Sequence, residues 1–314
     1  IILIFVQYML DKKQYPSLLK ISNLQIIPKP SADESAPIHK QFRIITVASK
    51  LGQLIDRVLL AYINKILPIT LTINPTIDQV LEPIFEKIEK SNANHRFIAC
   101  MDLESAFNAV DNRHILNFLT DLGFDLNLFL LFKNYFSDRI NSISKFNIEK
   151  SYLRGVYQGS TLAMCLWSTF MLYFLKDANN LPKNLTETNF IAKYYVDDLI
   201  IYFECDSVKL KGRGGKINPF RDNISLILES FIKKAAKYGL TINAKKTQIQ
   251  DLGPKNILID HEKRKYVIPS ITIFNEKIHH SQALTFLGLT HYCPFRKTKE
   301  NLPPFYLHFK NKTN

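Results

Sequence analysis

The sequence predicts an α+β fold, because interrupted helical patterns alternate along it with short β-rich runs, one of which reads as a hairpin. Its 314 residues can bury one large core or two modest ones. Hydrophobic residues make up 46% of the chain and aromatic residues 12%, a composition typical of globular and not of disordered proteins.

Three helices are expected from apolar residues at helical spacing. The first, at 76–88, opens with the capping-box sequence TIDQ, and Pro83 inside it predicts a kink. The second and third, at 112–123 and 222–239, each end at a glycine, the residue that most easily adopts the left-handed conformation after a helix. The stretch KLKGRGGKINP at 209–219 is expected to be a loop.

Two β-rich segments carry carboxylates at their ends. Residues 96–102 (RFIACMD) are an apolar run that ends at Asp102, and residues 190–203 (FIAKYYVDDLIIYF) are two runs joined by Asp197 and Asp198. The second pattern predicts a hairpin with two adjacent carboxylates at its tip. Aspartate also suits turns, so a purely structural turn is the alternative. Two like charges at one point of an apolar hairpin are unfavourable without a cation, which favours a cation site.

The charge of the chain is strongly positive. Lys and Arg number 41 against 28 Asp and Glu, a formal net charge of +13. The surplus lies mainly in the C-terminal half, in groups at 209–221, 233–246, 261–265 and 296–299. Such a surplus indicates a polyanionic partner, most commonly nucleic acid, while a generally basic surface is the alternative.

Four widely spaced cysteines form no CxxC pair: Cys100, Cys165, Cys205 and Cys293. This spacing argues against a disulfide framework or a zinc site and indicates an intracellular setting, without distinguishing nucleus from cytoplasm. The apolar runs at 1–10 and 162–175 are too short to span a bilayer, so no membrane association is expected. The chain begins with Ile1, which suggests a fragment of a longer product.

Several motifs then resemble one family in the same order along the chain. The hairpin sequence at 195–198 (YVDD) resembles the YxDD signature of reverse transcriptases. Four further blocks resemble palm motifs of that family: 102–110 (DLESAFNAV), 155–160 (GVYQGS), 239–247 (GLTINAKKT) and 286–288 (FLG). Three N-terminal blocks resemble the fingers of retrotransposon enzymes: 27–30 (IPKP), 42–45 (FRII) and 50–57 (KLGQLIDR).

The chain is therefore similar to the reverse transcriptase (RNA-directed DNA polymerase) domain of non-long-terminal-repeat, LINE-like retrotransposons. The resemblance implies a right-hand polymerase whose antiparallel palm sheet is backed by helices. It implies fingers at 1–95, a palm at 96–295 with an inserted fingers segment at about 124–153, and a truncated start of a thumb or a tail at 296–314. A thumb would then be mostly absent.

The resemblance also implies an activity: DNA synthesis from deoxynucleoside triphosphates on an RNA template with a DNA primer, without indicating any protein partner. Nucleotide addition uses two metal ions about 3.5–4 Å apart, which stabilise the attacking and leaving oxygens together. Mg²⁺, with Mn²⁺ as an alternative, prefers hard oxygen ligands. Asp102 and Asp197 are the implied bridging ligands and Asp198 an auxiliary one, and these three are the implied catalytic residues.

Six residues are implied to bind the nucleotide: Arg43, Phe107, Gln158, Gly159, Lys29 and Lys246. Phe107 would lie under the sugar and exclude a 2′-hydroxyl, although an ordinary core Phe is the alternative. The Arg43 guanidinium would clamp the triphosphate, with help from Lys29 unless that lysine is only a solvated loop residue. Lys246 would either protonate the leaving pyrophosphate or bind a backbone phosphate.

The remaining implied contacts, to primer and template, fall on Tyr195, Phe286, Leu287 and Gly288. Some positions depart from the family pattern: Ile44, Asn108, Tyr157, Ala163 and Met164. These departures support a second hypothesis, a decayed and noncatalytic nucleic-acid-binding remnant, which the three aspartates oppose. A third hypothesis is an RNA-dependent RNA polymerase, against which a bulky Phe107 argues.

Overall fold

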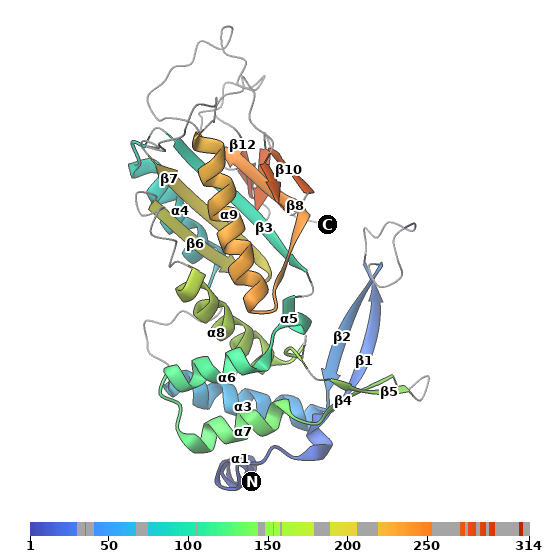
Figure 1. Ribbon diagram of the computed structural model, residues 1–314. Helices are drawn as coiled ribbons and strands as arrows, with labels where there is room; N and C mark the ends of the chain where they lie inside the picture. Colours follow the sequence, from blue (N-terminus) through green and yellow to red (C-terminus); the bar gives the residue numbers. More distant parts are fainter. Residues whose placement is uncertain are drawn as a thin grey trace, which may run out of the picture. The chain divides into compact units, whose positions relative to one another are not determined.

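The structure is a computed structural model (Figure 1) that describes residues 1–29, 35, 41–66, 75–93, 95–104, 106–143, 148–152, 154–157, 159–178, 189–205, 219–252, 271–273, 276–280, 283–286, 289–292 and 308–309. The chain divides into two compact units. The first comprises Ile1–Asn74 and Ser105–Tyr173, and the second comprises Pro75–Glu104 and Phe174–Asn314. This partition differs from the expected division into fingers, palm and thumb, which is defined by function and stays a prediction.

The first unit contains a small sheet of four strands in the order β2-β1-β4-β5. The strands are β1 (Ile21–Pro28), β2 (Phe42–Ala48), β4 (Arg139–Ile143) and β5 (Ile148–Tyr152). Strands β1 and β2 pair antiparallel, as do β4 and β5, whereas β1 and β4 run parallel. The parallel pair therefore joins two hairpins that are far apart in the sequence.

Helices make up the rest of the first unit: α1 (Ile2–Lys12), η1 (Ser17–Lys20), α3 (Lys50–Ile66), α5 (Ala106–Ala109), α6 (Asn112–Asp121), α7 (Leu126–Phe136) and the first part of α8 (Thr161–Ala178). Helix α3 buries the stripe Gly52, Ile55, Asp56, Leu59 and Ile63, which recurs at helical spacing. One member of this otherwise apolar stripe is an aspartate.

The second unit is built on a six-stranded sheet in the order β6-β7-β3-β8-β10-β9. Its strands are β3 (His95–Glu104), β6 (Asn189–Tyr195), β7 (Asp198–Cys205), β8 (Thr241–Asp251), β9 (Ile271–Ile273) and β10 (Glu276–His280). Four of its five pairings are antiparallel, and only β8 and β10 run parallel. A further sheet contains β11 (Ala283–Phe286), β12 (Leu289–Tyr292) and β13 (His308–Phe309).

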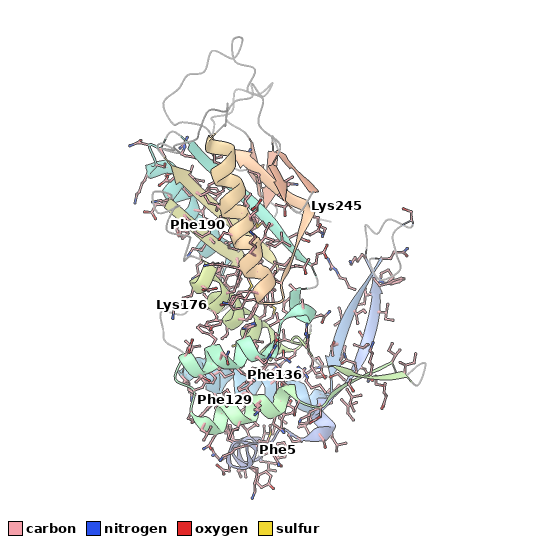
Figure 2. The ribbon with its side chains drawn as sticks, in the orientation of Figure 1. Phe5, Phe129, Phe136, Lys176, Phe190 and Lys245 are labelled. Atoms are coloured by element: carbon pink, nitrogen blue, oxygen red, sulfur yellow. The ribbon has the colours of Figure 1, made fainter. Side chains whose placement is uncertain are left out.

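Helices α4 (Ile77–Lys90) and α9 (Pro219–Lys237) lie on opposite faces of the six-stranded sheet (Figure 1). Val80, Leu81 and Ile84 of α4 share a buried cluster with alternate residues of β3 and β7, such as Ile98 and Ile200. On the other face Phe190 of β6, labelled in Figure 2, meets Phe231 of α9 with ring centroids 6.4 Å apart. Coverage on both faces explains why β3 and β7 read as nearly continuous apolar runs.

The expected α+β architecture, an antiparallel sheet with helices, is confirmed. Helix α4 begins with the predicted capping box, in which the Thr76 amide donates to Gln79 Oε1 at 2.9 Å and the Gln79 amide donates to Thr76 Oγ1 at 3.3 Å. The second expected helix is α6, capped by the Asp111 side chain. The third is α9, which begins at Pro219, three residues before the expected start. No described helix is long and apolar enough to cross a membrane.

Candidate active site

Strand pairing in the second unit brings the predicted metal ligands to one place. Asp102 near the end of β3 lies directly opposite Asp198, the first residue of β7. Asp197 occupies the β6–β7 turn after Val196, whose φ is 54°, and the Leu103 amide donates to the Asp197 carbonyl at 3.3 Å. The hairpin tip is thus fastened to β3. The sequence placed both aspartates at the tip, whereas the structure places only Asp197 in the turn and pairs Asp198 within the strand.

Strand β8 completes the surroundings of Asp102 from its other side. The Lys246 ammonium lies 3.1 Å from Asp102 Oδ1, and the Asn243 amide donates to Asp102 Oδ2 at 3.5 Å, the outer limit for such a bond. The Asp102 side chain is 24% exposed and that of Lys246 is 65% exposed. Asn243 lies within the GLTINAKKT motif, but the sequence gave no reason to assign it this contact.

The three carboxylates interact electrostatically. The pKa of Asp198 is raised to about 6, mostly by burial and also by the charges of Asp197 and Asp102, while Lys246 opposes the rise. Crowded like charges make the ionised form of Asp198 unfavourable. A cation placed among these groups would relieve that repulsion.

The donor set fits a divalent cation in its chemistry, since carboxylate oxygens are the ligands that Mg²⁺ prefers. Within the part of the chain that the structure describes, no group of three His, Cys, Asp or Glu side chains is already gathered in a metal-binding arrangement. The Asp102 carboxylate is instead engaged by Lys246. An ion pair this exposed contributes only about 0–1 kcal/mol, so it presents little barrier to exchange for a metal ion.

Of the four residues predicted at primer and template, Tyr195 and Phe286 are described, and both contact the core of the same unit. Tyr195 ends β6 opposite Asp198 and packs against the cluster that contains Ile98 and Ile200. Phe286 is buried in that cluster. Leu287 and Gly288 lie outside the described residues. Phe286 therefore serves as packing beneath the aspartate strands, and its contact with a primer stays a prediction.

The remaining predicted nucleotide-binding residues belong to the first unit. Arg43 is exposed on β2 opposite Ile27 of β1, and the Lys29 amide donates to the Gln41 carbonyl at 2.9 Å. The two basic residues therefore lie at the same end of one hairpin. Phe107 on α5 is buried, with its ring centroid 5.1 Å from that of Trp167. This contact shows the packing role of Phe107 and leaves its contact with a sugar a prediction.

The segment GVYQGS at 155–160 is a loop that precedes α8. The Gly155 amide donates to the Val110 carbonyl and the Val156 amide to the Phe107 carbonyl, each at 2.8 Å, which joins this motif to the one around Phe107. Gly159 has φ 117°, and a Cβ there would lie 2.9 Å from the Thr46 carbonyl oxygen, so only glycine fits. Gln158 lies outside the described residues.

Comparison with known families and structures agrees with this architecture. The sequence model of a family described as reverse transcriptase (RNA-dependent DNA polymerase) matches residues 27–291. A search of curated proteins gives no significant match.

Solved telomerase structures have a similar fold. Telomerase from Candida albicans in complex with a TWJ fragment of telomeric RNA has a TM-score of 0.58 and 13% identity, covering 98% of this chain and 49% of that chain. The corresponding Candida tropicalis complex gives 0.56 and 13%, covering 96% and 46%. The apo Candida tropicalis telomerase truncated from its C-terminal domain gives 0.52 and 13%, covering 93% and 55%. The chain thus spans about half the length of these proteins, and at such identity the likeness shows the fold alone.

Proposed function

Because this chain belongs to the reverse transcriptase (RNA-dependent DNA polymerase) family, we propose that it extends a DNA primer on an RNA template with deoxynucleoside triphosphates. One observation supports the proposal most: Asp102 lies opposite Asp198 in the β3–β7 pairing while Asp197 is fastened to the next residue of β3. The pairing thus places three aspartates from two distant segments at neighbouring backbone positions, and the charges of Asp102 and Asp197 both act on Asp198.

Asp102, Asp197 and Asp198 would hold two Mg²⁺ ions, with Mn²⁺ as the alternative. When bound, the ions would supply positive charge to the attacking and leaving oxygens of nucleotide transfer. Lys246 neutralises part of the carboxylate charge through its ion pair with Asp102. With cations bound by the carboxylates, the exposed Lys246 ammonium would be free to contact a phosphate, either as a proton donor to pyrophosphate or as a backbone contact.

The first unit would bind the incoming nucleotide. Arg43 and Lys29 lie at the same end of the β1–β2 hairpin and offer two cations to a triphosphate. Phe107 would face the sugar, and Gly159, which has no side chain, would let backbone approach the base pair. Gln158 would approach the nucleotide beside it. The positive net charge of +13 suits RNA template and DNA primer as partners.

The order of the motifs supports an origin in a LINE-like retrotransposon, in particular the IPKP sequence at 27–30 followed by FRII at 42–45. The second candidate function is a noncatalytic remnant that only binds nucleic acid, favoured by the departures from the family pattern. At one departure the fold compensates, because the Tyr157 hydroxyl donates to the Lys20 carbonyl at 3.0 Å. The fold therefore accommodates this departure, and the three aspartates remain the argument for the enzyme over the remnant.

Primer extension on an RNA template with Mg²⁺ tests the proposal. The parent chain should extend the primer, and Asp102→Asn and Asp197→Asn should abolish extension, while binding to an RNA–DNA duplex stays equal or becomes slightly tighter because a negative charge near phosphates is lost. Asp121→Asn, at an exposed carboxylate on α6, is the matched control and should extend normally. Extension by Asp102→Asn at the parent rate would refute the assignment, and duplex binding without extension by the parent would favour the remnant.

A further inference from the structure

A buried polar cluster in the first unit surrounds one aspartate of the block 50–57 (KLGQLIDR), to which the family resemblance assigns no role. Asp56 lies on the buried stripe of α3 and is only 2% exposed. Its Oδ1 accepts a hydrogen bond from the Tyr15 hydroxyl at 3.3 Å, and its Oδ2 accepts one from the Ser160 hydroxyl. Buried carboxylates are rare and unfavourable unless they are paired and hydrogen-bonded. The two hydroxyl donors therefore offset part of the cost of burying Asp56.

Arg139, the first residue of β4, supplies the positive charge near Asp56. Its side chain is buried, and its guanidinium carbon lies 3.0 Å from the ring centroid of Tyr157 and 4.7 Å from that of Tyr135. Burial raises the pKa of Asp56, while the Ser160 hydroxyl, the Arg139 charge and the Tyr15 hydroxyl oppose that rise. The cluster therefore combines one anion, one cation and aromatic faces, a combination that favours a single arrangement.

Two members of this cluster belong to the loop at 155–160. Ser160 donates to Asp56 and at the same time accepts from the Leu162 amide at 3.2 Å, so its hydroxyl links α3 to the first turn of α8. Tyr157 packs on Arg139 and donates to the Lys20 carbonyl at 3.0 Å. The Gly155 and Val156 amides bond to the segment 107–110, so each described residue of the loop except Gly159 makes a polar or ring contact. At Gly159 the Thr46 carbonyl leaves no space for a side chain.

We propose that Asp56 is a positioning residue for nucleotide binding, which it controls by holding Ser160 and thereby fixing the loop 155–160. The proposal rests on the proposed function, because only that function gives the loop a nucleotide to contact. Asp56 touches no substrate itself. It acts through the hydroxyl of Ser160, and Tyr157 and Arg139 act on the other side of Gln158.

Single substitutions around Asp56 separate loop anchoring from general stability. Ser160→Ala and Asp56→Asn weaken the bond on the loop side, whereas Tyr15→Phe removes an equally buried hydroxyl from the other oxygen of the same carboxylate. The loss of a hydrogen bond to a charged group changes an equilibrium constant by a factor of about 10–100. We expect Ser160→Ala and Asp56→Asn to raise the KM for deoxynucleotides by about tenfold with kcat at saturation changed less, and Tyr15→Phe to leave KM within about twofold.

Hydrogen exchange of the Gly155 and Val156 amides provides a readout that does not depend on activity. Exchange should be faster than in the parent for Ser160→Ala and Asp56→Asn and unchanged for Tyr15→Phe. The proposal is overturned if Tyr15→Phe raises KM or speeds exchange as much as Ser160→Ala does, or if neither loop-side variant changes either quantity. Absence of extension by the parent would refute the proposed function alone, since exchange would still decide whether Asp56 anchors the loop.

Discussion

Asp198 and Asp56 lie in the two compact units, and their carboxylates have opposite surroundings. Asp198 is half-buried beside two further carboxylates, and its pKa is raised by burial and by those like charges. Asp56 is fully buried, yet two hydroxyls donate to it and Arg139 supplies positive charge. At Asp198 the neighbouring carboxylates repel one another, and a bound cation would reduce that repulsion. At Asp56 the hydroxyl donors and the Arg139 charge already stabilise the carboxylate. The comparison contrasts a carboxylate whose charge is repelled by its neighbours with one whose charge is offset by protein groups.

The largest expected effect is on stability, and it distinguishes the two regions directly. Asp56→Ala would leave the buried charge of Arg139 less compensated and two buried hydroxyls without their acceptor. Each buried hydroxyl left without its hydrogen-bond partner costs about 1–3 kcal/mol. Asp102→Ala removes an exposed ion pair and a long hydrogen bond from Asn243, and it relieves repulsion with Asp198, so its effect should stay within about 1 kcal/mol.

Urea denaturation with a common slope measures both changes. Equal losses of unfolding free energy in Asp56→Ala and Asp102→Ala would remove the distinction between a ligand site and a structural cluster. A larger loss of unfolding free energy in Asp102→Ala than in Asp56→Ala would show that Asp102, and not Asp56, is the structural carboxylate.

The sequence predicted the carboxylate site better than the buried cluster, and the reason is physical. Local patterns identify a capping box at Thr76 and a hairpin with acidic residues at its end, because both depend on neighbours in the chain. The contact between Asp56 and Ser160 joins residues 104 positions apart, and the parallel pairing of Ile21 with Ile140 leaves no local trace. The sequence marked Asp56 only by its place in the block 50–57 and by its position within the apolar stripe of α3.

Aromatic residues show a second limit of sequence reasoning. A pattern identifies Phe107 and Phe286 as family positions but does not separate a ring that packs in the core from one that meets a substrate. The structure shows packing for both, against Trp167 and in the cluster beneath β3 and β7 respectively. Substrate contact by either ring is compatible with that packing and needs a functional measurement.

An intermediate effect is expected at Phe107, where packing and substrate contact would respond differently. If the ring also faces the incoming sugar, Phe107→Val should raise the ratio of ribonucleotide to deoxynucleotide incorporation at least about tenfold, equivalent to about 1.4 kcal/mol. If the ring only packs on Trp167, the variant should lose stability, and the incorporation of ribonucleotides and of deoxynucleotides should fall by the same factor. Measuring this ratio beside the melting temperature separates the two roles, and a lower melting temperature with an unchanged ratio would leave Phe107 as packing.

The smallest expected effect concerns the pH dependence of stability at the carboxylate site. The folded-state pKa of Asp198 is raised from 3.8 to about 6, so the folded chain binds a proton more tightly than the unfolded chain. The stabilisation linked to this proton is complete below pH 3.8 and is lost as the pH rises through about 6. In EDTA at pH 7.5, Asp198→Asn should therefore melt a few degrees above the parent, because the variant lacks the repelled charge.

That advantage should shrink steadily as the pH is lowered from about 6 toward 4, where the parent takes up the same proton. Mg²⁺ at pH 7.5 should raise the melting temperature of the parent more than that of Asp198→Asn, because a ligand that binds only the folded state stabilises it. Asp121→Asn, at the exposed end of α6, controls for the loss of one negative charge and should show neither dependence. An Asp198→Asn variant that melts below the parent at pH 7.5 would mean that Asp198 is satisfied by the protein, as Asp56 is, and that the repulsion inferred between the three carboxylates is not present.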